Sequence, residues 1–68
     1  MKMKILRENI SYNMACSILE TNHYFLGGVE IKTMNNKTEF WTKDTVTKEN
    51  RLVALYNEDT GVLMVVTN

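Results

Sequence analysis

The stretch VEIKTM-NN-KTEFWTK, residues 29–43, decides the fold. Two runs rich in β-branched and aromatic residues flank Asn35-Asn36, and asparagine accepts the positive φ that a two-residue hairpin turn requires. Folding the chain at this turn places Lys32 opposite Glu39, which is a favourable cross-strand pair. One face of the hairpin then collects Val29, Ile31, Thr33, Thr38, Phe40 and Thr42. Because the turn chemistry and the pairing agree, the stretch predicts an antiparallel hairpin.

The end of the chain predicts a second hairpin, with strands at residues 51–56 and 62–67 and a loop at residues 57–61. Gly61 suits the left-handed conformation that closes a longer hairpin loop. Both strands are apolar at nearly every position, so neither face of this hairpin is suited to water. By alternation we expect one side to carry Tyr56, Val62, Met64 and Val66, and the other to carry Val53, Leu55, Leu63 and Val65.

The first third of the chain predicts a strand and then a helix. Residues 2–8 alternate weakly, and their lysines suit a strand at the edge of a sheet. Residues 11–21 predict a helix, in which Asn9 or Ser11 caps the first turn and Asn22 ends the last. Its apolar stripe comprises Ile10, Met14, Ala15, Ile18 and Leu19. A strand over the same residues is the alternative, because Tyr, Cys and Ile are not strong helix formers.

The order of these elements is strand, helix, and four strands in two hairpins. It predicts a single α+β domain over residues 1–68, in which one helix packs across an antiparallel sheet of about five strands. A small all-β barrel is the alternative. A chain of 68 residues supplies only a small core. Cys16 is the only cysteine, so an intrachain disulfide is impossible, and oligomerisation or an unusually well packed core is the expected source of additional stability.

The composition excludes several classes of function. Eight basic and eight acidic residues cancel to a net charge of zero, whereas a nucleic-acid binder needs a positive surface. The longest apolar run is far shorter than the ~20 residues of a membrane helix, and the charged N-terminus does not resemble a signal peptide. We therefore expect a cytoplasmic protein that binds neither nucleic acid nor membrane.

No motif in the chain predicts catalysis, a cofactor or a metal site. Cys16 and His23 are the one thiol and the one imidazole, and together they offer a nucleophile and a base. No oxyanion donor or orienting acid accompanies them, so a buried thiol and a histidine at a helix end are the expected roles. One cysteine and one histidine also cannot fill a four-ligand zinc site. The sequence therefore predicts a protein that is not an enzyme.

The remaining prediction is a small interaction module that binds and modulates another protein. Its expected partner-binding anchors are Trp41, Tyr24, Phe25 and Tyr56, because large aromatic residues dominate binding hot spots. Val62, Met64 and Val66 are the expected contact with a second copy, most simply in a two-fold dimer. The absence of proline and the frequent Lys, Asn, Thr, Ile and Glu are typical of AT-rich genomes. Together with the small size, this usage favours a phage or mobile-element accessory protein, and some proteins of that kind are inhibitors.

A small-molecule binding or sequestering protein is the alternative function. Its nucleotide-like ligand would occupy a pocket between subunits, with aromatic walls and a few polar groups such as Asn13, His23 and Lys43.

Overall fold

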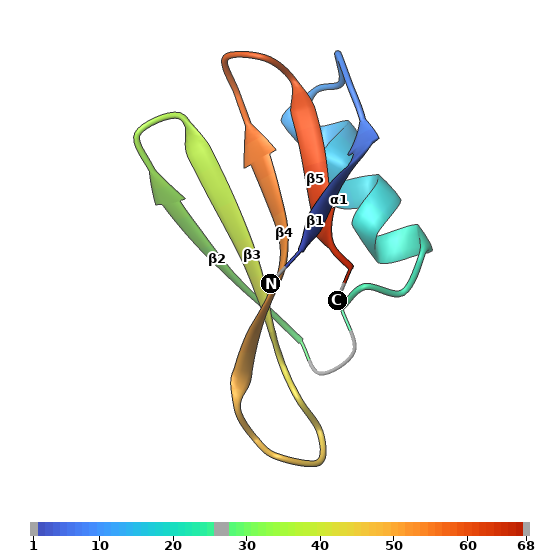
Figure 1. Cartoon of the computed structure of the whole chain (residues 1–68), viewed down its shortest axis with the longest axis vertical. Coiled ribbons are helices and arrows are strands. Elements are labelled where there is room, and N and C mark those ends of the chain that lie inside the picture. Colours follow the sequence, from blue (N-terminus) through green and yellow to red (C-terminus); the bar gives the residue numbers. More distant parts are fainter. Residues whose placement is uncertain (1, 26–27, 68) are drawn as a thin grey trace.

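The computed structural model describes residues 2–25 and 28–67. Its elements are β1 (Met3–Arg7), α1 (Tyr12–Thr21), β2 (Val29–Met34), β3 (Lys37–Lys43), β4 (Asn50–Asn57) and β5 (Val62–Val66). The five strands form one antiparallel sheet in the order β1-β5-β4-β3-β2, and α1 lies on one side of it (Figure 1). The predicted α+β fold is therefore confirmed. The barrel alternative is wrong, because β1 and β2 lie at opposite ends of an open sheet.

The β2–β3 hairpin has the register that its sequence predicts. Pairing runs without a shift from Val29–Thr42 to Met34–Lys37, and it includes Lys32 opposite Glu39. Asn35 has a φ of 56°, so the turn uses the left-handed conformation at its first central residue. A two-residue turn of this kind matches the right-handed twist of the strands that it joins.

Both ends of α1 are closed by local hydrogen bonds. The Ser11 hydroxyl accepts from the backbone N–H of Met14 at 3.2 Å, which confirms Ser11 as the N-cap. At the other end Asn22 is the C-cap, as predicted, but its expected left-handed conformation is wrong, because its φ is −92° and His23 adopts the left-handed φ of 61°. The N–H groups of His23 and Tyr24 donate to the carbonyls of Glu20 and Leu19, which forms a Schellman motif.

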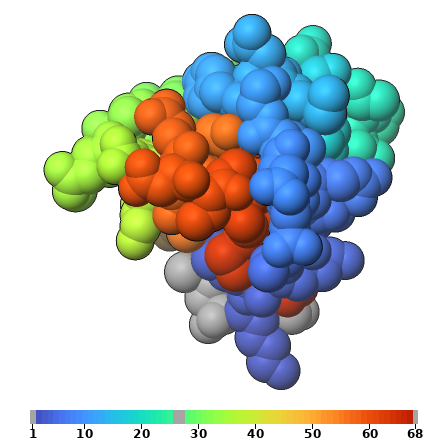
Figure 2. Space-filling model, turned by 90° about the horizontal axis from the view of Figure 1, so that it is seen from above, coloured from blue at the N-terminus to red at the C-terminus, as the bar shows by residue number. Residues whose placement is uncertain are grey.

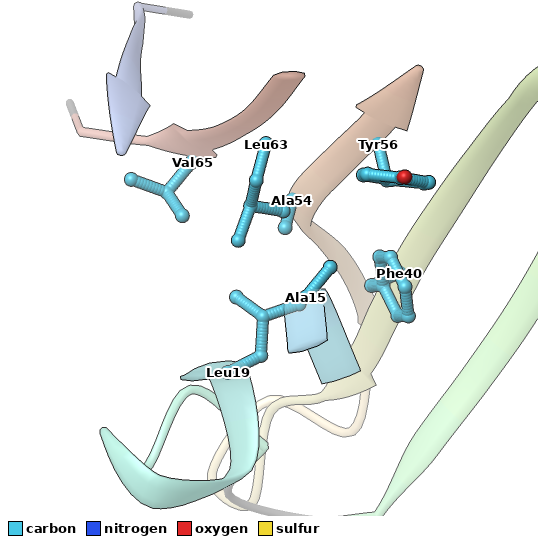
Figure 3. Packing of buried hydrophobic residues seen from close by; sticks show 7 residues of the cluster. All are labelled: Ala15, Leu19, Phe40, Ala54, Tyr56, Leu63 and Val65. Atoms are coloured by element: carbon cyan, nitrogen blue, oxygen red, sulfur yellow. The ribbon is translucent and has the colours of Figure 1, made fainter. Parts of the chain in front are cut away.

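The hydrophobic core lies between α1 and the strands β3, β4 and β5. Its buried members are Ala15, Leu19, Phe40, Ala54, Tyr56, Leu63 and Val65 (Figure 3). The ring of Phe40 stacks between Tyr12 and Phe25, with centroid distances of 6.2 and 6.0 Å. Met14 does not belong to the stripe that faces this core, since 52% of its surface is exposed. Tyr12 takes that place, because its ring contacts both Phe40 and Tyr56.

The register of the β4–β5 hairpin differs by one residue from the sequence prediction. Asn57 pairs with Val62, which places Tyr56 opposite Leu63 on the helix side. A slip of one residue moves side chains to the other face, because side chains alternate along a strand. Tyr56 therefore does not share a face with Val62 and Met64, and that expectation is wrong. Leu55 is the second departure, because its pairing with Met64 places it on the face away from Leu63 and Val65. Val53 does lie on the side of Leu63 and Val65, as expected, since it packs against the core cluster next to a bulge between β3 and β4.

The β4–β5 loop is tied to the connection between β1 and α1. The N–H of Ile10 donates to the carbonyl of Gly61 at 3.1 Å, and the Tyr56 hydroxyl donates to the carbonyl of Ile10 at 2.6 Å. Gly61 has the predicted positive φ, 68°, and the backbone of Asn9 and Ile10 lies 3.1–3.2 Å from where its Cβ would be. Seen from above, the loop and the connection lie side by side (Figure 2). These contacts place the start of the helix over the sheet.

Candidate interaction surface

The face of the sheet opposite α1 carries an apolar patch. Its members, called the open patch below, are Ile5, Leu55, Val62, Met64 and Val66. Met64 lies opposite Ile5 on one side and Leu55 on the other, so these three side chains form a row across β1, β5 and β4. Ile5 is exposed and the other four members are partly exposed. The patch follows directly from the register, because Leu63 and Val65 between its members point into the core.

The same face becomes charged on β3 and β2. The Trp41 indole N–H donates to the Glu39 carboxylate at 3.1 Å, and the Lys32 ammonium lies 4.9 Å from the centre of the Trp41 ring. A cation over a tryptophan ring is attracted by the negative face of the ring. In the isolated chain Trp41 is therefore covered by Lys32, and a partner that contacts its ring has to move this lysine.

Two shallow depressions mark the boundary between the apolar and charged halves, and Lys37, Leu55 and Asn57 border both of them. One has a volume of about 290 Å³ and extends over Val62 and Met64. The other has a volume of about 460 Å³ and extends toward the tip of the β2–β3 hairpin. The open patch therefore has a rim that supplies both hydrogen-bond donors and acceptors.

The structure separates the four aromatic residues predicted as anchors. Only Trp41 lies on the face of the open patch. Tyr24 and Phe25 pack against the core on the helix side, and Tyr56 is only 4% exposed. Val62, Met64 and Val66 do share a face, as expected, but Leu55 and Ile5 complete the patch with them. The alternation of Met3 and Ile5 in the sequence is a signal for the position of Ile5. The position of Leu55 on this face depends on the register of the β4–β5 hairpin.

The polar groups expected in a small-molecule pocket are not gathered in one place. Asn13 lies in the first turn of α1, and His23 follows the opposite end of the helix. Lys43 lies at the end of β3 and borders a small depression with Trp41 and Asn50. These three residues therefore lie at three separate places in the fold.

The residues with possible chemical roles are also dispersed. Cys16 is a free, half-buried thiol on α1 beside Tyr12, and burial together with this contact raises the pKa of the Tyr12 phenol. His23 is exposed in the left-handed position that follows the helix. Across residues 2–25 and 28–67, no three His, Cys, Asp or Glu side chains gather as metal ligands would. In the same ranges, no helix combines the length and the apolar character needed to span a bilayer.

Comparisons of the chain with protein families, with curated proteins and with solved structures find no match.

Proposed function

We propose that the protein is a small non-enzymatic interaction module that forms a homodimer and binds another protein through the open patch. The observation that supports this proposal is the contiguous row of Ile5, Met64 and Leu55 on the sheet face opposite α1. Large contiguous apolar patches are uncommon on monomeric proteins and mark binding sites. The size and residue usage of the chain suit a phage or mobile-element accessory protein that modulates a host protein.

The surroundings of the patch fit a protein partner. Interfaces have an apolar centre and a polar rim, and aromatic residues and methionine are enriched in them. Met64 lies at the centre of the patch, while Lys37, Glu39 and Asn57 lie along one border. Trp41 stands next to that border and is the one predicted aromatic anchor on this face. We therefore expect Trp41 and Met64 to be the residues that contribute most to the affinity.

Site-directed photo-crosslinking tests this assignment. A benzophenone side chain is placed at Met64 and, as a matched control, at Asn13, which is exposed on the helix. On irradiation in the native lysate, we expect an adduct of defined mass from Met64 and none from Asn13. Excess wild-type protein should suppress this adduct. For the folded Val62→Asp and Trp41→Ala proteins, the concentration needed to suppress the adduct should be at least tenfold higher, since each substitution removes an interface contact.

The proposal fails if the two probe positions give the same adducts, or if the Val62→Asp protein competes as well as the wild type. Circular dichroism of the competitors establishes that they are folded. A thermal-shift screen against nucleotides addresses the small-molecule alternative, because a ligand that binds only the native state raises the unfolding midpoint. We expect no shift.

A further inference from the structure

The outer edge of β2 is open along its whole length. All six residues of β2 are exposed, and β2 is the last strand of the sheet, so no described strand pairs with its outer side. The two-residue turn makes Met34–Lys37 a hydrogen-bonded pair, and every second pair along the hairpin is then hydrogen-bonded too. The N–H and C=O groups of Val29, Ile31 and Thr33 therefore point away from β3, toward solvent.

The other edge of the sheet is protected in ways that β2 is not. β1 has a register irregularity between Ile5 and Arg7, and bulges of this kind discourage pairing with another chain. The pairing of β2 with β3 is regular, and β2 consists of VEIKTM without proline or glycine. Val29 and Ile31 are 44% and 45% exposed on the helix side of the sheet. α1 lies over the other end of the sheet, away from β2 (Figure 1). This edge offers both backbone hydrogen bonds and apolar side chains.

We propose that two copies of the chain join edge to edge through antiparallel pairing of β2, about a two-fold axis at Ile31. Charge selects this register. With Ile31 opposite Ile31 of the second copy, Glu30 lies opposite Lys32 of the second copy, and symmetry repeats this attraction. Centring the axis on Glu30 instead places two glutamates opposite each other, and centring it on Lys32 places two lysines opposite each other. Only the Ile31 register pairs opposite charges.

The same register also covers the apolar side chains of the edge. Ile31 meets its symmetry mate, while Val29 lies opposite Thr33 of the second copy, all on the helix side. Glu30 and Lys32 lie on the open side, where Lys32 already contacts Trp41. Each outward residue gains a partner for its N–H and its C=O, which is how an added strand binds to a sheet edge. One continuous sheet of two copies results.

This inference rests on the homodimer of the proposed function and assigns its contact to β2, in place of Val62, Met64 and Val66. A two-fold axis perpendicular to the sheet leaves both helices on one side and both open patches on the other. The dimer therefore keeps two patches free for the protein that it binds. Two linked sites raise the apparent affinity for a target that presents two copies of its surface.

Sedimentation equilibrium of the full chain tests the register through charge variants. In Glu30→Lys protein, two lysines face each other across the contact, and in Lys32→Glu protein two glutamates do so. We expect each variant to dimerise at least tenfold more weakly than the wild type. An equimolar mixture of the two variants restores opposite charges at both pairs, so we expect it to form heterodimers with an affinity close to that of the wild type.

The mixture is the decisive measurement, because two variants that had merely unfolded could not recover the wild-type dimer affinity when they are mixed. Lys32→Glu also places two glutamates opposite each other within the hairpin at Glu39, so circular dichroism is recorded for each variant. A wild-type protein that stays monomeric, or a mixture that fails to associate, overturns the inference. If Val62→Asp abolishes the dimer while the charge variants keep it, the self-contact lies on the open patch. That result refutes the β2 edge contact, whereas the crosslinking at Met64 tests the proposed function separately.

Discussion

The two sides of the sheet carry similar apolar residues but hold them differently. On the helix side, Leu63 and Val65 are buried against α1, whereas Met64 between them and Val66 after them are only partly covered. One strand thus supplies both a core and a surface patch. The difference shows that apolar character alone does not assign a residue to the core. An apolar residue of the sheet belongs to the core if it lies on the side that α1 covers. The hydrogen bonds of Ile10 with Gly61 and Tyr56 position α1 on that side.

The largest expected effect comes from the neighbouring residues Leu63 and Met64, which point to opposite sides of β5. Leu63→Ala leaves a cavity in the core and should lower the free energy of unfolding by about 3 kcal/mol. Met64→Ala should lower it by less than about 1 kcal/mol, since the side chain is already partly hydrated. Chemical denaturation of both variants measures the difference. Equal losses would mean that the open patch is as well packed as the core.

Gly61→Ala tests the attachment of the β4–β5 loop to the start of the helix. A Cβ would strain a residue with a φ of 68° and would press on the backbone of Asn9 and Ile10. We expect a loss of about 2 kcal/mol in the free energy of unfolding. Gly61→Asn is the control, because asparagine tolerates the left-handed conformation but still carries a Cβ. If Gly61→Asn restores full stability, backbone strain and not the close approach explains the loss.

The smallest effects are expected at two buried threonines of β3, where one substitution should act in opposite directions. The Thr38 hydroxyl is buried without a hydrogen-bond partner among the described residues, whereas the Thr42 hydroxyl donates to the carbonyl of Gly28 at 2.7 Å. Thr38→Val should therefore raise the free energy of unfolding by up to about 1 kcal/mol, and Thr42→Val should lower it by about 1 kcal/mol. Thermal unfolding of both variants measures the shifts. A loss at Thr38 would show that its hydroxyl has a bound partner in solution.

Local sequence patterns predict the parts of the fold that depend on neighbouring residues. The β2–β3 register follows from a two-residue turn together with the Lys32–Glu39 pair, and Ser11 is recognisable as an N-cap. The same kind of argument fails at the helix C-terminus. Asparagine tolerates a positive φ better than histidine does, yet His23 adopts it. The helix ends there because the N–H of Tyr24 bonds back to Leu19, while Tyr24 itself packs on the core.

The candidate site is predicted only in part. Apolar alternation identifies Val62, Met64 and Val66 as one group. Whether Leu55 or Tyr56 shares their face depends on the length of the β4–β5 loop, and the sequence leaves that length ambiguous. Residues 57–61 suit a loop of five, whereas the pairing of Asn57 with Val62 leaves four. The Tyr56 hydroxyl bonds to Ile10, 46 positions earlier in the chain, on the helix side. A local pattern contains no information about that contact.

From its residue order alone, this chain specifies two hairpins, one capped helix and an apolar end, because turns, caps and alternation act between near neighbours. The tertiary structure decides which apolar residues become core and which remain at the surface. That choice depends on where α1 lies, and α1 is positioned by bonds among Ile10, Tyr56 and Gly61, which come from distant parts of the chain. A strand with two apolar faces can bury either one, and the helix covers only one of them.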